Sequence, residues 1–248
     1  MTALGAPLDD AHLLVLARSA GFVFRAPGFS HPDVPPPVRA GLAYVLTIAL
    51  APQAVSVLPG ATGHGGLVVA LAAEAVLGAA IGTAAAMLYD GAYAGGRALD
   101  DYVGIRASVP SANVQAGAGF GRLWSLAFVT AFFTLGGSGV AILAFAQTFD
   151  SVPPGALVRA SDLAAFAVTL PATLVRAAFF VAGPPVAIAL VAQVALAGVA
   201  RVVPRFSTFT LSFPIVFACV VLVTVASLPL VLPAAAVPWM DLSRLRAR

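Results

Sequence analysis

Two long stretches without a charged residue decide what this chain can fold into. From Arg205 to Asp241 the sequence runs for about 35 residues without a charge between the two ends, and from Leu123 to Phe149 for about 27, whereas one helical crossing of a bilayer requires about 20 apolar residues. A soluble core cannot bury so much unbroken apolar helix. The chain is therefore predicted to fold in lipid or within a large apolar assembly.

The composition of the chain agrees with this constraint. Hydrophobic residues make up 60% of the 248 residues and charged residues only 9%, whereas soluble domains carry about 25% charged residues. Apolar segments are spread evenly, which predicts one membrane domain over residues 1–248 that ends in a short basic tail, Arg244–Arg248. The net charge of +3 comes from scattered arginines, and this pattern predicts contact with membrane lipid and none with nucleic acid.

Prolines and glycines divide the apolar sequence into six to seven helical segments, several of them kinked or broken. The expected segments cover residues 8–26, 38–51, 67–89 with a continuation to 99, 123–149, 162–203 and 206–232. Gly136 and Gly137 are expected to kink or break the fourth segment. Gly183-Pro184-Pro185 is expected to divide the fifth, which is too long for one crossing. The predicted fold class is an all-α membrane protein.

Glu74 is the one acid inside an apolar run. A bare carboxylate in hydrocarbon is costly, so such a residue pairs, takes up a proton or faces water. It is interpreted either as an acid in a gate or ion path, or as half of a structural pair with Arg18 or Arg97. Glu74, Gly78 and Gly82 follow one another at four-residue spacing on one helix face, where small residues let a second helix approach closely.

Enzymatic and metal chemistry have little support in the sequence. His12, His31 and His64 lie far apart, and the single cysteine, Cys219, is interpreted as an apolar filler. The nearest approach to a nucleophile motif, Gly136-Gly137-Ser138-Gly139, is interpreted as a site of close helix packing. The chain is therefore predicted to be no enzyme and to hold no cofactor or metal.

A small-solute permease is the alternative function that the residues themselves leave open. A break at Gly183-Pro184-Pro185 would free backbone carbonyls, as the broken helices of transporters do at substrate sites, although such prolines also merely shape helix bundles. Arg176, between two uncharged stretches, is expected to extend toward the membrane interface or to mark the end of a short half-helix. No inverted repeat is visible in the sequence, and this absence weakens the permease alternative.

A motif late in the chain resembles a known family. It begins with Arg201 and Pro204, continues through a short polar turn to Phe209 and ends at Pro214. An arginine and a proline that precede a polar turn and a second proline resemble the signature of the FliR/SctT family, the R/T-type export-gate subunits of flagella and type III secretion systems. The resemblance covers most of the chain, residues 18–232.

Earlier elements also resemble this family, and two of them favour one branch. The earlier matches are Arg18, Ala26-Pro27, Pro37-Val38-Arg39, Ala51-Pro52 and the row Glu74, Gly78, Gly82. Asp101 and Gly104 resemble the aspartate-x-x-glycine element of the injectisome branch. Gly136-Gly137 resembles its double glycine. The sequence therefore favours the injectisome branch, with a flagellar export-gate subunit as the alternative.

The resemblance implies a function, a location and a set of partners. An R/T-type subunit joins P/R-type and Q/S-type subunits in a helical assembly around an export channel in the bacterial inner membrane. A switch protein of the FlhB/SctU type surrounds the assembly, and unfolded secreted polypeptides pass through it. Hydrophobic hairpins in such an assembly stack against sister subunits. The expected role of this chain is accordingly structural and gating.

The most polar part of the chain interior, residues 90–122, falls where the resemblance implies a gate. Polar residues at membrane depth must lie beside water or protein. By position, the loop that helps to close the pore would run from Gly104 to Gln115. The candidate gate residues are Gly104, Arg106, Ser108, Asn113 and Gln115.

Overall fold

The computed structural model describes residues 9–30, 34–54, 64–104, 119–156, 158–202 and 208–233. Within these ranges the regular elements are all helices, which confirms the predicted all-α fold. They are α1 (Asp10–Arg25), α2 (Pro36–Ala54), α3 (His64–Val103), α4 (Phe120–Thr134), α5 (Gly137–Ser151), α6 (Ala160–Val202) and α7 (Thr208–Val231). Three of them, α3, α6 and α7, are long and apolar enough to cross a membrane. α4 and α5, which are separated by a sharp bend, form a fourth span if the two together make one crossing. The chain thus has the fold of a multi-pass membrane protein.

Proline positions explain some helix ends and not others. α1 ends at Arg25, and Ala26 is its C-cap. This is the expected end of the helix, because Pro27 cannot continue it. α2 begins with prolines in its first turn, where a missing N–H costs nothing. It continues to Ala54, however, so the expectation that it stops at Pro52 is wrong. A proline this close to the end of a helix removes only its own hydrogen bond, and the last residues still complete the final turn.

The predicted break in the fourth apolar segment is confirmed. α4 ends at Thr134 and α5 begins at Gly137. The N–H of Leu135 donates to Ala131 O at 2.8 Å, which closes the last turn of α4. Gly136 then adopts φ +85°, a left-handed conformation that favours glycine because it has no Cβ.

The expected division of the fifth segment is wrong. α6 runs without interruption from Ala160 to Val202, a helix of 43 residues, through Gly183-Pro184-Pro185. Each proline removes one N–H donor and crowds the carbonyl four residues before it, and both effects are confined to the preceding turn. In an apolar surrounding, any non-helical alternative would leave more backbone groups without partners, so the helix persists. The permease hypothesis loses the broken helix on which it depended.

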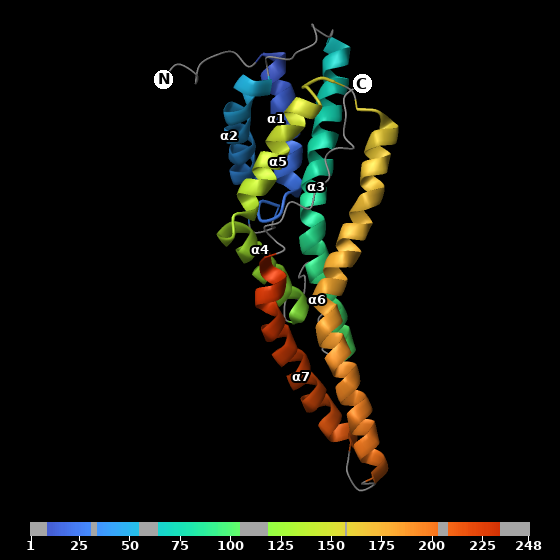
Figure 1. Ribbon diagram of the computed structural model, residues 1–248. Helices are drawn as coiled ribbons and strands as arrows, with labels where there is room; N and C mark the ends of the chain where they lie inside the picture. Colours follow the sequence, from blue (N-terminus) through green and yellow to red (C-terminus); the bar gives the residue numbers. More distant parts are fainter. Residues whose placement is uncertain are drawn as a thin grey trace. The chain divides into compact units, whose positions relative to one another are not determined.

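Residue contacts divide the chain into two compact units. Unit 1 contains α1, α2, the part of α3 up to Met87, α5 from Ser138 and the start of α6 up to Pro171. Unit 2 contains the rest of α3, α4, the rest of α6, and α7. In unit 1, α1 and α5 run alongside the first part of α3, and in unit 2, α6 and α7 form an antiparallel hairpin (Figure 1). That residues 1–248 act as a single domain stays a prediction.

Candidate functional site

The first polar cluster of the molecule is a buried ion pair between α1 and α3. Arg18 Nε donates to Glu74 Oε2 at 2.5 Å, and Arg18 Nη2 donates to Glu74 Oε1 at 3.0 Å. Arg18 is 0% exposed and Glu74 2%. This two-point contact between a guanidinium and a carboxylate is the strongest common form of a charged hydrogen bond. Of the two arginines proposed as partners of Glu74, the structure selects Arg18.

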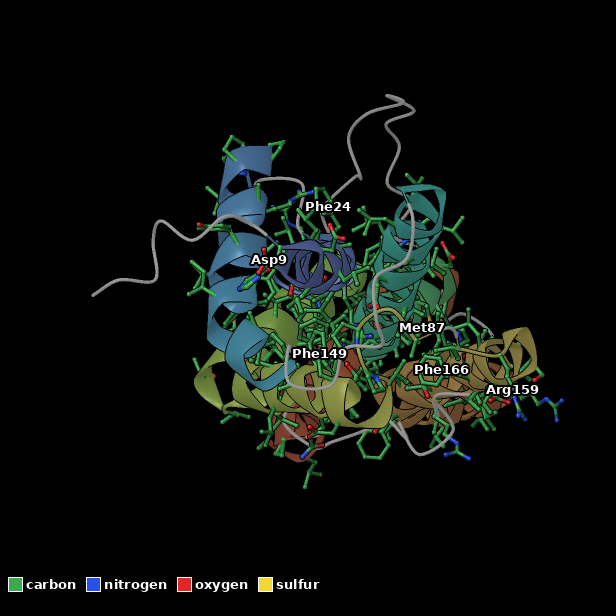
Figure 2. All side chains as sticks on the ribbon, turned by 90° about the horizontal axis from the view of Figure 1, so that it is seen from above. Asp9, Phe24, Met87, Phe149, Arg159 and Phe166 are labelled. Atoms are coloured by element: carbon green, nitrogen blue, oxygen red, sulfur yellow. The ribbon has the colours of Figure 1, made fainter. Side chains whose placement is uncertain are left out.

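Arg18 also holds the end of α5. Its Nη1 donates to the carbonyl oxygens of Thr148 at 3.2 Å and Val152 at 2.9 Å. Its Cζ lies 4.3 Å from the ring centroid of Phe149, which stabilises the cation further. A positive charge at a helix C-terminus also offsets the partial negative charge of the last carbonyls. Figure 2 shows Phe149 among the side chains that lie between the helices of unit 1.

Glu74 in turn holds the connection between α5 and α6. Its Oε1 accepts a hydrogen bond from the N–H of Gly155 at 2.8 Å. The carboxylate therefore has fixed donors from Arg18 and from the backbone. A carboxylate with such partners is fixed in place, so the geometry supports a structural tie between α1, α3 and the α5–α6 connection.

The glycines on α3 bring these charged residues within reach of each other. A Cβ on Gly78 would overlap with the carbonyl oxygen of Arg18, and one on Gly82 would lie 2.6 Å from Phe22 O. From the other side, a Cβ on Gly21 of α1 would overlap with the backbone of Ala75. The two helix backbones therefore touch, as small residues allow in membrane proteins.

Gly136 does not share this role. Nothing lies within 4 Å of a Cβ added at Gly136, which is exposed. The expectation of close helix packing is wrong for Gly136, because its conformation serves the turn between α4 and α5. Gly137, the first residue of α5, is buried.

Arg97 was expected to be buried, and this expectation is wrong. It lies in unit 2, and its side chain is 36% exposed. Its Nη1 is 3.9 Å from Asp100 Oδ2, while its Cγ and Cδ lie against Gly121. Arg97 cannot form an ion pair with Glu74, because both residues lie on α3, about six turns apart.

Asp100 is a buried polar residue that the sequence did not single out. It is 1% exposed, and its carboxylate accepts hydrogen bonds from the N–H groups of Phe120 at 2.7 Å and Gly121 at 3.2 Å, the first residues of α4. Gly119, the residue before α4, has φ +138° and no side chain to cap the helix. Asp100 therefore supplies the N-cap from another helix. The signal in the sequence was a helix start that is flanked by glycines and lacks a capping side chain.

Of the expected gate loop, Gly104 to Gln115, the structure describes only the first residue. Gly104 follows the end of α3 with φ +82°, and its N–H donates to Asp101 O at 3.3 Å. The chain is described again from Gly119, next to Asp100. The other gate candidates, Arg106, Ser108, Asn113 and Gln115, lie outside the described residues.

The family-signature residues fall around the α6–α7 hairpin. Arg201 lies in the last turn of α6 and is exposed. Phe209 and Pro214 belong to α7, which contains Pro214 without breaking. Pro204 lies outside the described residues. Among the residues that the structure describes, no three His, Cys, Asp or Glu side chains are grouped so that they could hold a metal ion.

Comparison with known proteins identifies the family. The model of the family described as "Bacterial export proteins, family 1" matches residues 10–240, a range that includes every described helix. No curated protein matches the sequence. The matched family contains structural subunits of the export apparatus of flagella and type III secretion systems. The chain therefore belongs to the bacterial export proteins, family 1, which is the FliR/SctT family.

Proposed function

We propose that this chain is the R/T-type subunit that, with P/R-type and Q/S-type subunits, builds the inner-membrane channel through which a type III secretion system exports unfolded polypeptides. A FlhB/SctU-type switch protein would surround the assembly. Family membership supports a role in the export apparatus. The observation that carries the proposal further is the amount of apolar helix that the chain leaves uncovered.

The uncovered apolar surface of α6 is too long for a bilayer. A straight helix of 43 residues is about 65 Å long, whereas the hydrocarbon core of a bilayer is about 30 Å thick. Large apolar side chains are exposed toward both ends of α6, with Val168 77% and Val202 81% exposed. Lipid can cover only part of this surface. Exposed apolar surface outside the lipid is stabilised by burial against protein, so the geometry supports contact with sister subunits.

A structural and gating role also fits the chemistry of the buried groups. The two buried carboxylates of the described residues, Glu74 and Asp100, are both engaged in holding helices together. Neither is left free for acid–base chemistry. The resemblance would place pore closure in the segment from Gly104 to Gln115, which begins directly after α3.

The injectisome branch is the finer part of the proposal. Its support is the sequence resemblance at Asp101 with Gly104 and at Gly136 with Gly137. A flagellar export-gate subunit is the second candidate, supported by the same family match.

Co-expression tests the proposal directly. With P/R-type and Q/S-type subunits, the chain should purify as a defined complex, and by itself it should be unstable in detergent because its apolar surface lacks a cover. Deleting the chain should abolish secretion through its host apparatus. A stable, monodisperse monomer in mild detergent, or unchanged secretion after deletion, would contradict the proposal.

A further inference from the structure

The second half of α6 carries two arginines that enclose an uncharged segment. Arg176 and Arg201 are both exposed, and residues 177–200 between them contain no charged residue. Arg201 follows Arg176 by about seven helical turns, so both residues lie on the same face of the helix, about 37 Å apart along its axis. Both belong to unit 2.

This arginine face points away from the rest of unit 2. The opposite face of α6 is buried, with Val181 and Ala189 both 0% exposed. α3 packs against that buried side, since a Cβ on Gly91 would lie 2.6 Å from Ala177 Cβ and one on Gly95 would lie 2.6 Å from Ala178 O. The arginine face is therefore on the uncovered side of the helix.

The arginine face is apolar along the whole distance between its two cations. Phe180, Leu190 and Val194 are 55%, 57% and 67% exposed. Nothing lies within 4 Å of a Cβ added at Gly183 or Gly198, so no other part of the described chain covers this face.

The one polar side chain of the segment does not interrupt this face. Residues 177–200 contain a single polar side chain, Gln193. Gln193 lies about a quarter turn from the arginine face. Its Oε1 accepts a hydrogen bond from the hydroxyl of Tyr102 at 3.2 Å, so its polar group has a partner within unit 2.

The spacing of the two arginines matches the thickness of a membrane. Their separation of about 37 Å lies between the hydrocarbon thickness of about 30 Å and the full thickness of about 40–45 Å that includes the head groups. Each guanidinium then falls just outside the hydrocarbon, at the depth of the lipid phosphates. Guanidinium groups bind phosphate oxygens through paired N–H donors, and arginines at helix ends reach the interface in this way.

We infer that residues 177–200 of α6 form a lipid-facing membrane crossing, and that Arg176 and Arg201 bind lipid phosphates in opposite leaflets. The uncharged segment has the length of one membrane crossing. An arginine flanks it at each end, and both arginines lie on the same face of the helix. A face covered by protein would not require this arrangement. The first part of α6, with the exposed Val168, then lies outside the hydrocarbon and needs a protein cover. The inference rests on the multi-pass membrane fold and not on the export function.

Photocrosslinking tests which surroundings cover each part of α6. The full chain is co-expressed with its partner subunits in bacterial membranes, with a benzophenone amino acid in place of Leu190, Val194 or Val168. Positions 190 and 194 should give lipid adducts, and position 168 should give protein adducts. Protein adducts at 190 and 194 would overturn the lipid-facing crossing. Missing protein adducts at 168 would instead contradict the proposed assembly and leave the crossing intact, so the two failures are distinguishable.

Accessibility mapping tests the two arginines as anchors. In a Cys219→Ala background, single cysteines along α6 are labelled with a membrane-impermeant maleimide, and the protected segment should begin next to Arg176. Arg176→Leu should move this boundary toward the N-terminus by about one helical turn, because the helix can then slide to a new depth. Arg176→Lys should restore it. Arg159→Gln, which removes an exposed arginine at the start of α6, should leave it in place. An unmoved boundary in Arg176→Leu would overturn phosphate anchoring.

Discussion

The two units bury a carboxylate in different ways. In unit 1, Glu74 faces a fully buried arginine and one backbone N–H. In unit 2, the carboxylate of Asp100 accepts hydrogen bonds from two backbone N–H groups. The guanidinium of Arg97 is 3.9 Å from this carboxylate and is partly exposed. A charge whose main partner is another buried charge loses most of its stabilisation when that partner is removed. A charge held by backbone donors keeps them as long as the helix they belong to stays in place.

The largest expected effect comes from removing half of the buried pair. Glu74→Ala leaves the Arg18 guanidinium buried without its counter-charge, and breaking such a pair costs about 3–5 kcal/mol. The measurement is the thermal stability and yield of the chain in its co-purified complex. The double variant Arg18→Met with Glu74→Leu should be clearly more stable than Glu74→Ala. If Glu74→Ala behaved like the exposed control Arg159→Gln, the buried pair would not be the tie described above.

The next effect concerns the close approach of α1 and α3. Gly78→Ala places a Cβ against the carbonyl oxygen of Arg18, and such overpacking costs about 1–3 kcal/mol. Gly139→Ala in the same unit is the matched control, because a Cβ there meets nothing, and it should be neutral or slightly stabilising. Both are compared by thermal unfolding of the complex. Equal unfolding temperatures for the two variants would contradict the contact.

A smaller effect is expected in unit 2. Asp100→Ala removes the cap of α4, and losing an N-cap costs about 0.5–2 kcal/mol. Hydrogen exchange should rise at the N–H groups of Phe120 and Gly121, which lose their acceptor, and stay unchanged in α1. Faster exchange throughout both units would show that Asp100 does more than cap α4.

The smallest effect is expected at Arg97. Its side chain is partly exposed and 3.9 Å from Asp100, and exposed ion pairs contribute about 0–1 kcal/mol. Arg97→Gln should therefore leave the thermal stability of the complex nearly unchanged. A loss as large as that of Glu74→Ala would remove the contrast between the two units.

The amino-acid sequence by itself determined the features that depend on composition and local backbone chemistry. Uncharged apolar runs of membrane length favour helices in an apolar surrounding, because a helix pairs its backbone polar groups within one segment. The break at Gly136 follows from glycine's access to a left-handed conformation. The need of Glu74 for a partner follows from the cost of an unpaired charge in an apolar surrounding.

The tertiary structure decided which distant groups meet. Arg18 and Arg97 were equal candidates for Glu74 in the sequence, and only the contact of α1 with the glycine face of α3 selects Arg18. Asp100 became a helix cap because α4 begins beside it. Such outcomes depend on packing between segments far apart in the chain, and local sequence patterns do not encode it.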